Sequence, residues 1–306
     1  MRIVSLLPSA TEIVCALGLA NDLVGISHDC DYPPEILGKP VLSGAVVDPA
    51  LPSEQIDAAI RNQVHRGMSV YHLDAGLLQA LRPDLILTQE LCTVCAPSFT
   101  EVVQAAKILD AQPRIVSLEP NTLEEILQTI LLVGELTGRR RPAESLVAEL
   151  RGRIDRVCRA EWKERPRVAC IEWLDPAFIA GHWVPEMVEL AGGRDGLGRA
   201  GKPSFPIDWD MVIDYRPEVI VLMPCGFHVE RALRELGALE RLPGWEDLPA
   251  VRNGRVYATD ASSYFNRPGP RIVTGLEILA TILHPAQPFF STPKGSWQQI
   301  EHEKGE

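Results

Sequence analysis

Cysteines and histidines are the residues of this sequence whose chemistry stands out first. Cys92 and Cys95 form a Cys-x-x-Cys pair that follows an apolar strand pattern and precedes a predicted helix. A thiol near a helix N-terminus has a lowered pKa and can act as a metal ligand or a redox centre. A single pair without a second one is a weak zinc signal. Buried inert thiols, a metal or ligand contact, and redox chemistry are therefore three open interpretations.

Four further groups lie in loops that are predicted to share one end of the fold: Cys225, Cys30, His28 and His182. Sulfur together with imidazole suits zinc, haem iron or the cobalt of a corrinoid. We therefore add Cys225 to the Cys-x-x-Cys pair as a predicted metal-contacting thiol. The chain has seven cysteines in all, and an odd number scattered over a long chain is not a disulfide framework.

No catalytic constellation accompanies these groups. The sequence has no glycine-rich phosphate loop directly after a strand, no His-x-x-x-His zinc spacing and no serine elbow. Glu172 and Asp175 are interpreted as polar loop residues rather than as a catalytic acid pair. We therefore expect a binding protein and not an enzyme, with chelatase-like or thiol-redox activity as the alternative.

Strand–helix alternation supplies the elements that must position these loops. Ser9 and Glu12 fit the N-cap and capping box of a first helix. Predicted strands alternate with helices through the first half of the chain, at residues 3–7, 23–26, 84–88 and 114–118. Such alternation is typical of a mostly parallel sheet covered by helices on both faces.

Two helical stretches follow, at residues 122–137 and 142–162, each with apolar residues at helical spacing. About 20 residues at 1.5 Å each span about 30 Å, which is enough to tie two lobes together. The predicted organisation is an N-terminal α/β lobe at 1–138, a connecting helix at 139–164, a C-terminal α/β lobe at 165–288 and a flexible tail at 289–306.

The second lobe repeats the pattern of the first. Four later segments echo earlier ones in the same order along the chain: 167–171 echoes 3–7, 186–188 echoes 12–14, 216–221 echoes 82–87, and 255–257 echoes 114–116. An ordered internal correspondence of this kind indicates a duplicated α/β lobe. The fold class is therefore two related α/β lobes with mostly parallel sheets, joined by one long backbone helix.

Ligands of open parallel α/β sheets bind outside the carboxyl ends of the strands. The loops expected at that end are rich in aromatic residues, whose flat faces suit a large, partly apolar macrocycle. Ordinary core packing is the alternative for each ring. The candidate ligand-binding residues are His28, Tyr32, Trp173, His182, Trp183, Phe227, Ser263, Tyr264, Phe265 and Arg267.

Composition excludes several classes of protein. The formal net charge is −11 over 306 residues, which argues against nucleic acid as a partner because phosphate binding needs a basic face. No apolar run reaches the roughly 18–20 residues that span a bilayer. The N-terminus fits a strand better than a signal peptide, so the expectation is a cytoplasmic protein, or a periplasmic or cell-surface one if a leader was removed before Met1.

Several short motifs in a specific order carry a resemblance over residues 2 to 283. They are Leu7-Pro8-Ser9-Ala10-Thr11-Glu12, Asp31-Tyr32-Pro33-Pro34, the strand at 82–88, Ala180-Gly181 with 184–193, and Tyr264-Phe265 with Pro270-Arg271-Ile272. With them the chain resembles the vitamin B12-binding proteins of ABC importers, within the family of siderophore, haem and corrinoid receptors.

The resemblance implies a monomeric substrate-binding protein that holds a cobalamin-like corrinoid or a related metal chelate, such as haem or a ferric siderophore, in a cleft between its lobes. It implies no required cofactor beyond a bound corrinoid, haem or metal ion. Receptors of this family dock on an ABC permease through one acid per lobe, and Asp74 and Asp210 fall near those positions. The competing hypothesis is a cytoplasmic metal- or tetrapyrrole-handling protein that uses the Cys and His loops.

Overall fold

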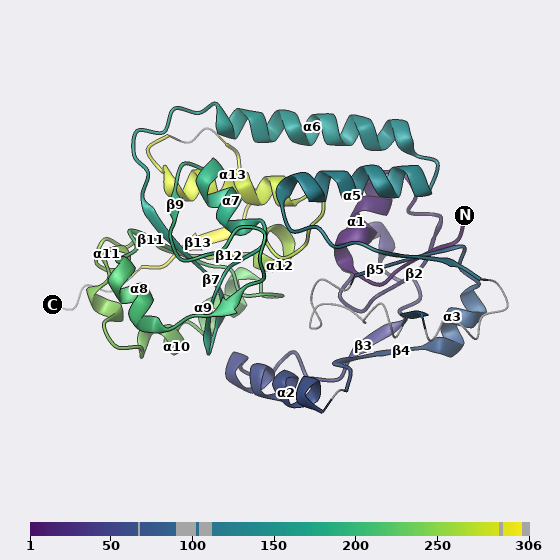
Figure 1. Cartoon of the computed structure of the whole chain (residues 1–306), viewed down its shortest axis with the longest axis horizontal. Helices are drawn as coiled ribbons and strands as arrows, with labels where there is room; N and C mark the ends of the chain where they lie inside the picture. The colour runs from purple at the N-terminus through teal and green to yellow at the C-terminus, as the bar shows by residue number, and fades with distance from the viewer. Residues whose placement is uncertain (67, 90–101, 104–111, 288–289, 302–306) are drawn as a thin grey trace. The chain divides into compact units, whose positions relative to one another are not determined.

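The computed structural model describes residues 1–66, 68–89, 102–103, 112–287 and 290–301 (Figure 1). The chain divides into two compact units. Unit 1 comprises residues 1–120 and 124–148, and unit 2 comprises residues 121–123 and 149–306. Each unit is an α/β structure, which confirms the predicted fold class.

Unit 1 is built on a parallel sheet with the strand order β2-β1-β5-β6. Its strands are β1 (Ile3–Ser5), β2 (Leu23–Ile26), β5 (Leu85–Thr88) and β6 (Arg114–Ser117). Every residue of β1 and β5 is buried, as expected for parallel strands that are covered on both faces. The helices of this unit include α1 (Pro8–Ala16), α3 (Ala75–Leu81) and α5 (Leu123–Leu136), the last of which begins in the segment that belongs to unit 2.

The capping box predicted at the start of α1 is wrong. The helix begins at Pro8, its N-cap is Leu7, and no side chain caps it. Proline at the first helical position has no N–H to satisfy and already has a helical φ, so it starts the helix without a polar cap. Ser9 and Glu12 are both buried inside the helix.

A long excursion separates β2 from α3. After the 3₁₀ turn Pro34–Ile36, strands β3 (Ser43–Ala45) and β4 (Tyr71–Leu73) form an antiparallel pair that is connected through helix α2 (Ser53–His65). Only Ser53 and Ile56 of α2 are buried. The excursion is anchored at its base, where Asp74 donates its N–H to the carbonyl of Leu42 at 2.7 Å.

Unit 2 has a seven-stranded sheet with the order β10-β8-β7-β11-β12-β13, and β9 also pairs with β7. The strands are β7 (Arg167–Leu174), β8 (Ala177–Ile179), β9 (Arg194–Asp195), β10 (Phe205–Pro206), β11 (Val219–Leu222), β12 (Val256–Thr259) and β13 (Trp297–Gln299). The helices are α7 (Val184–Leu190), α8 (Trp209–Tyr215), α9 (Val229–Arg234), α10 (Gly237–Glu240), α11 (Pro249–Arg252), α12 (Ala261–Tyr264) and α13 (Ile272–Leu283), with a 3₁₀ turn at Trp245–Asp247.

One part of the predicted flexible tail is ordered. Strand β13 lies inside residues 289–306 and pairs antiparallel with β12, with Tyr257 opposite Gln299. Because β13 lies at the edge of the sheet, its sequence carries no strand pattern from which it could be predicted. A strand with intermediate and exposed residues has no apolar run, and it is held by backbone hydrogen bonds to a neighbour that is distant in the sequence.

The two units repeat one topology. The order β2-β1-β5-β6 in unit 1 matches β9-β7-β11-β12 in unit 2. Arg82 and Arg216 both follow a seven-residue helix in the left-handed conformation, with φ of 43° and 52°. The acid two residues later also repeats: Asp84 accepts from the N–H of Arg2 at 2.7 Å, and Glu218 accepts from the N–H of Arg167 at 2.9 Å. The echo in the sequence is therefore structural.

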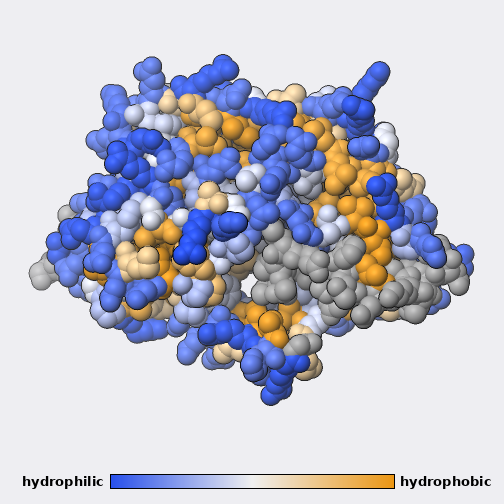
Figure 2. Space-filling view, viewed as in Figure 1, coloured by the Kyte–Doolittle hydropathy of each residue, from blue (hydrophilic) through white to orange (hydrophobic). Residues whose placement is uncertain are grey.

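Helix α6 (Arg140–Cys158) is the predicted long helix and crosses from unit 1 into unit 2. Within unit 2, Arg153 forms two hydrogen bonds to the carboxylate of Glu277 on α13, at 2.6 and 3.0 Å. A planar guanidinium that makes two parallel bonds fixes orientation as well as distance. Figure 2 shows that the outer side of α6 is mainly hydrophilic, whereas apolar residues reach the surface along α5. Among the described residues, no helix combines the length and apolar composition that a bilayer span requires.

Candidate ligand-binding site

His28 directly follows β2 and is held by the excursion of unit 1. Its Nδ1 lies 2.8 Å from the hydroxyl of Ser43 on β3, and its ring lies 5.2 Å from that of Tyr71 on β4. Nε2 lies 3.5 Å from the carboxylate of Asp29. The sequence analysis missed Tyr71 because the excursion brings it to His28 from more than 40 positions away.

Tyr32 and Cys30 lie in the same loop but differ in environment. Tyr32 is 42% exposed, so its ring is accessible to a ligand. Cys30 is buried, and its Sγ lies 3.1 Å from the hydroxyl of Thr11 and 3.2 Å from that of Ser27. This thiol belongs to the interior of unit 1, so the interpretation of Cys30 as a loop metal ligand is wrong.

Trp173 lies on strand β7 and not in a loop. Its Nε1 donates to the carbonyl of Asp175 at 3.1 Å, and its ring lies 5.3 Å from that of Phe227. The guanidinium of Arg231 stacks on Phe227 at 4.3 Å, which is the distance of a cation–π contact. Phe227 is only 5% exposed, so Trp173 is the more accessible ring of this pair.

Glu172 precedes Trp173 and sits at a break in strand register, because Ile171 and Trp173 pair with the consecutive residues Ile179 and Phe178. An extra residue of this kind is a β-bulge, which re-aims a side chain. The carboxyl group accepts hydrogen bonds from the Ser204 side chain and the Gly181 backbone, but its burial outweighs them and raises the pKa of Glu172 to about 7. Interpreting Glu172 as a polar loop residue was therefore wrong.

His182 occupies the turn between β8 and α7. Its Nδ1 lies 3.2 Å from Oδ1 of Asn121, a residue in the short segment before α5. Burial lowers the pKa of His182, which favours the neutral imidazole. The ring stacks on Trp183 at 5.5 Å. Asn121 lies 61 positions away and no local pattern marks it.

The remaining aromatic candidates are mainly structural. Trp183 is 5% exposed and donates its indole N–H to the carbonyl of Phe265 at 2.8 Å, and Phe265 is 1% exposed. Tyr264 is half-buried, with the guanidinium of Arg271 at 5.7 Å from its ring. Trp183 and Phe265 therefore pack in the interior of unit 2, which corrects the expectation that these rings face a ligand.

Two polar candidates lie on or beside α12. Ser263 is buried in its first turn and donates its N–H to Asp260 at 3.0 Å. Arg267 donates to the hydroxyl of Ser262 at 3.1 Å and is partly exposed. Arg267 is thus the polar candidate of this segment that solvent can reach.

The predicted metal thiols do not form a site within the part of the chain that the structure describes. There, no three His, Cys, Asp or Glu residues come close enough to hold a metal ion. Cys225 is half-buried, and its backbone N–H donates to the carbonyl of Glu172 at 3.0 Å. Cys92 and Cys95 lie outside the described residues.

The two predicted docking acids are both exposed but have different local roles. Asp74 is the N-cap of α3 and accepts from the N–H of Leu77 at 2.8 Å. The residue that occupies the same place in unit 2 is Asp208, the N-cap of α8, which accepts from the N–H of Asp210 at 3.2 Å. Asp210 itself lies in the first turn of that helix.

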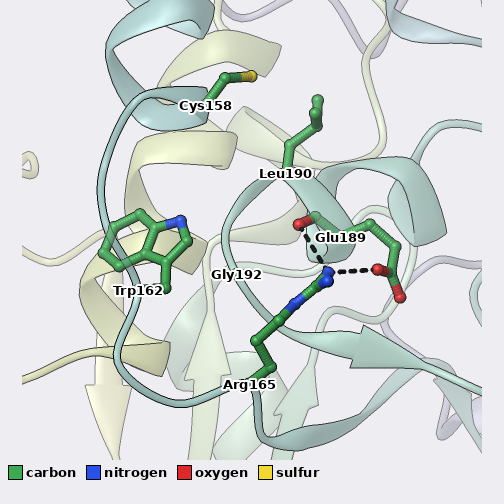
Figure 3. Close-up of a pocket in the computed structure, with 6 residues that line it drawn as sticks. All are labelled: Cys158, Trp162, Arg165, Glu189, Leu190 and Gly192. Atoms are coloured by element: carbon green, nitrogen blue, oxygen red, sulfur yellow. Dashed lines mark hydrogen bonds and ion pairs between the residues drawn. The ribbon is translucent and has the colours of Figure 1, made fainter.

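The hollows of the two units differ in chemical character. One of about 280 Å³ in unit 2 is lined by Cys158, Trp162, Arg165, Glu189, Leu190 and Gly192 (Figure 3). It adjoins the amino end of β7, and its arginine already pairs with Glu189 at 2.5 Å. Another of about 280 Å³ lies in unit 1 after β6, where Ser117, Glu119 and Leu132 are among its lining residues. Of these two hollows, the one in unit 1 lies at the carboxyl end of a strand.

Comparison with known proteins gives a consistent result. A sequence profile of the periplasmic binding protein family matches residues 3–263. The vitamin B12-binding protein of Vibrio cholerae serotype O1 is 26% identical over 290 residues, which cover 94% of this chain and 90% of that protein. An uncharacterized ABC transporter substrate-binding lipoprotein of Bacillus subtilis (strain 168) is 25% identical over 293 residues, covering 93% and 80%.

Solved structures agree on the fold. A periplasmic heme binding protein from Pseudomonas aeruginosa superposes with a TM-score of 0.74 at 22% identity, covering 99% of both chains. The periplasmic vitamin B12 binding protein of Vibrio cholerae superposes with a TM-score of 0.68 at 24% identity, covering 94% of this chain and 97% of that one. At these identities the likeness speaks for the fold alone.

Proposed function

This chain belongs to the periplasmic binding protein family, and we propose that it is the substrate-binding protein of an ABC-type importer. Its ligand is a cobalamin-like corrinoid or a related metal chelate, haem or a ferric siderophore. The relatives named for vitamin B12, and the one named as an ABC transporter substrate-binding lipoprotein, support this assignment. As a binding protein it needs no cofactor and performs no reaction on its ligand.

The observation that carries the proposal is the set of aromatic and imidazole groups at the carboxyl ends of the strands in both units. Unit 1 contributes Tyr32 and the His28–Tyr71 pair, and unit 2 contributes Trp173 and His182. Flat aromatic faces with a few polar groups suit a macrocycle that carries amide or carboxylate side groups. We propose that these two sets are the ligand-contacting groups of their respective units.

We also propose where the protein works and what it meets. The relatives named periplasmic or lipoprotein support a place outside the cytoplasmic membrane. A monomer would then dock on its permease through one acid on each unit, Asp74 on unit 1 and Asp210 or its neighbour Asp208 on unit 2. The competing hypothesis of a cytoplasmic metal- or tetrapyrrole-handling protein depends on the Cys and His loops, and no three of the described His, Cys, Asp or Glu residues come close enough to hold a metal ion.

The test is direct titration of the purified full chain with cyanocobalamin, ferric haem and a ferric hydroxamate siderophore. Calorimetry and quenching of tryptophan fluorescence report binding independently of any transporter. We expect saturable one-to-one binding of at least one of these chelates. If all three leave both signals unchanged, the proposed function is wrong.

A matched pair of variants locates the site. Trp173→Ala and Trp209→Ala each remove a half-buried tryptophan whose indole donates to a backbone carbonyl, at 3.1 and 3.0 Å. Trp209 packs on Trp245 and not on the candidate site. Truncation of an aromatic anchor costs on the order of 1–2 kcal/mol, so Trp173→Ala should weaken binding about tenfold or more. Equal losses in both variants would place the ligand elsewhere.

A further inference from the structure

The backbone of His182 is unusual for its position. Three non-glycine residues among those described have a positive φ: Arg82, His182 and Arg216. The two arginines follow α3 and α8, where a left-handed residue commonly ends a helix. His182, with φ of 50°, instead precedes α7. The left-handed backbone is unfavourable for residues other than glycine, so the imidazole at this position points to a role for the side chain.

The surrounding chain holds this conformation from both sides. The N–H of His182 donates to the carbonyl of Lys202 at 2.5 Å, and its own carbonyl accepts from Gly201 at 2.8 Å. The preceding residue has no room for a side chain, because a Cβ on Gly181 would lie 2.3 Å from the Lys202 carbonyl oxygen. An unfavourable backbone conformation that the neighbouring chain enforces in this way is commonly found at functional positions.

The imidazole ring is oriented as well. Its Nδ1 lies 3.2 Å from Oδ1 of Asn121, and an amide oxygen can only accept, so Nδ1 carries the proton. Nε2 then presents a lone pair, and no described residue hydrogen-bonds to it. The segment that bears Asn121 is fixed in turn, since the N–H of Leu123 donates to Glu186 at 3.0 Å.

Other described histidines are arranged differently. Both ring nitrogens of His28 face polar atoms, the hydroxyl of Ser43 and the carboxylate of Asp29. Nε2 of His284 lies 3.0 Å from the carbonyl of Ala191. His228 pairs through Nδ1 with Asp260 at 2.8 Å, but its side chain is 59% exposed. His65 and His72 are exposed. Of the six described histidines, His182 is thus the half-buried one whose Nδ1 has an acceptor and whose Nε2 has no hydrogen-bond partner among the described residues.

We propose that Nε2 of His182 is an axial ligand to the metal of the bound chelate and that Asn121 is its positioning residue. An N–H to acceptor bond on the far nitrogen is the usual support of a metal-ligating imidazole, because it fixes the tautomer and the ring orientation. Binding forms one dative Nε2–metal bond and displaces a water or another weak axial ligand, with no change in the oxidation state of the metal.

This inference rests on the proposed function and narrows its substrate class. A corrin or porphyrin with an exchangeable axial position can accept the imidazole. A hexadentate ferric siderophore has no open position and cannot. The protein should therefore prefer planar tetrapyrrole-type chelates whose axial ligand is labile.

The experiment uses the full chain with two probes, ferric haem and aquocobinamide. Tryptophan quenching measures affinity, and the absorption spectrum with electron paramagnetic resonance measures nitrogen coordination. His182→Gly is the chief variant because glycine accepts the positive φ and keeps the fold. His228→Ala is the histidine control, because that side chain is exposed and lies outside the candidate ligand-binding residues. Asn121→Ala removes the support of the ring.

We expect a nitrogen-ligated spectrum for the wild type and for His228→Ala with at least one probe. His182→Gly should lose that spectrum while its melting temperature stays equal or rises. Asn121→Ala should keep the ligand but weaken affinity about tenfold, at the lower end of effects seen for partners of metal ligands. An unchanged spectrum in His182→Gly, or its loss in His228→Ala instead, overturns the inference and leaves the proposed function standing. Failure of both probes to bind the wild type also overturns the inference, whereas the proposed function is decided by the titration with the three chelates.

Discussion

Glu172 gives the pH dependence of stability a specific origin. Its pKa is about 7 in the folded chain against an ordinary value of 4.5. Between these values the native state keeps a proton that the unfolded chain has lost, so the native state binds more protons and stability falls as pH rises. The contribution is complete below about pH 4.5 and is lost once the pH passes about 7.

The magnitude follows from the size of the shift. Each unit of pKa corresponds to about 1.4 kcal/mol, so the interval from 4.5 to about 7 is worth about 3.5 kcal/mol at most. Glu172→Gln keeps the shape and can still accept from the Gly181 N–H, but it never ionises. The variant should match the wild type at low pH and exceed its stability by up to about 3.5 kcal/mol above pH 7.

Urea unfolding of both proteins at several pH values between about 4.5 and 8 measures this difference. Glu230→Gln is the control, because it removes the same charge from an exposed position on α9. Burial also raises the pKa of Asp195, but that contribution is common to all three proteins and cancels. Parallel pH profiles for the wild type and Glu172→Gln would refute the argument that burial controls this carboxyl group.

Three further substitutions test the scaffold. Arg153→Ala should lower the free energy of unfolding by about 2 kcal/mol, because it leaves the buried carboxylate of Glu277 without its partner. Arg140→Ala removes an exposed ion pair on the same helix and should lower it by under about 0.5 kcal/mol. Chemical denaturation measures both. Asp208→Ala should lower the free energy of unfolding by about 1 kcal/mol, because it removes the N-cap of α8. Asp210→Ala should lower it by less, and equal losses in the two variants would contradict the N-cap role of Asp208. Gly181→Ala should lower the melting temperature, because its Cβ would lie 2.3 Å from a backbone oxygen, and an unchanged value would show that the turn can shift.

The scaffold could be predicted from the sequence because its signals are local. Each signal involves residues that are neighbours in the sequence: the apolar runs, Pro142 in the first turn of α6, and the repeated Arg-Pro-acid pattern. Strand β13 could not, because an edge strand with polar residues is specified by its partner and not by its own composition.

The aromatic candidates show the limit of residue type as a signal. A tryptophan or phenylalanine is equally suited to a core and to a ligand face. Trp183 and Phe265 are interior, whereas Trp173 and Tyr32 are more accessible. Nor could a local pattern reveal Asn121 or Tyr71, since each reaches its histidine through the fold. Glu172 left one trace, an acid inside an otherwise apolar strand.

The duplication separates the scaffold from the candidate site. The features that the units share are structural. Asp84 and Glu218 each accept a hydrogen bond from the backbone at the start of a strand, and the left-handed Arg82 and Arg216 end helices. The candidate ligand groups lie where the units differ. In unit 1, Tyr71 lies on the β3–α2–β4 excursion. In unit 2, the turn that bears His182 is held by backbone hydrogen bonds to the loop before β10, and β10 pairs with β8. A duplicated frame with unlike insertions thus lets each unit carry its own candidate groups, an exposed tyrosine and an imidazole–tyrosine pair in unit 1 and a fixed imidazole beside a tryptophan in unit 2.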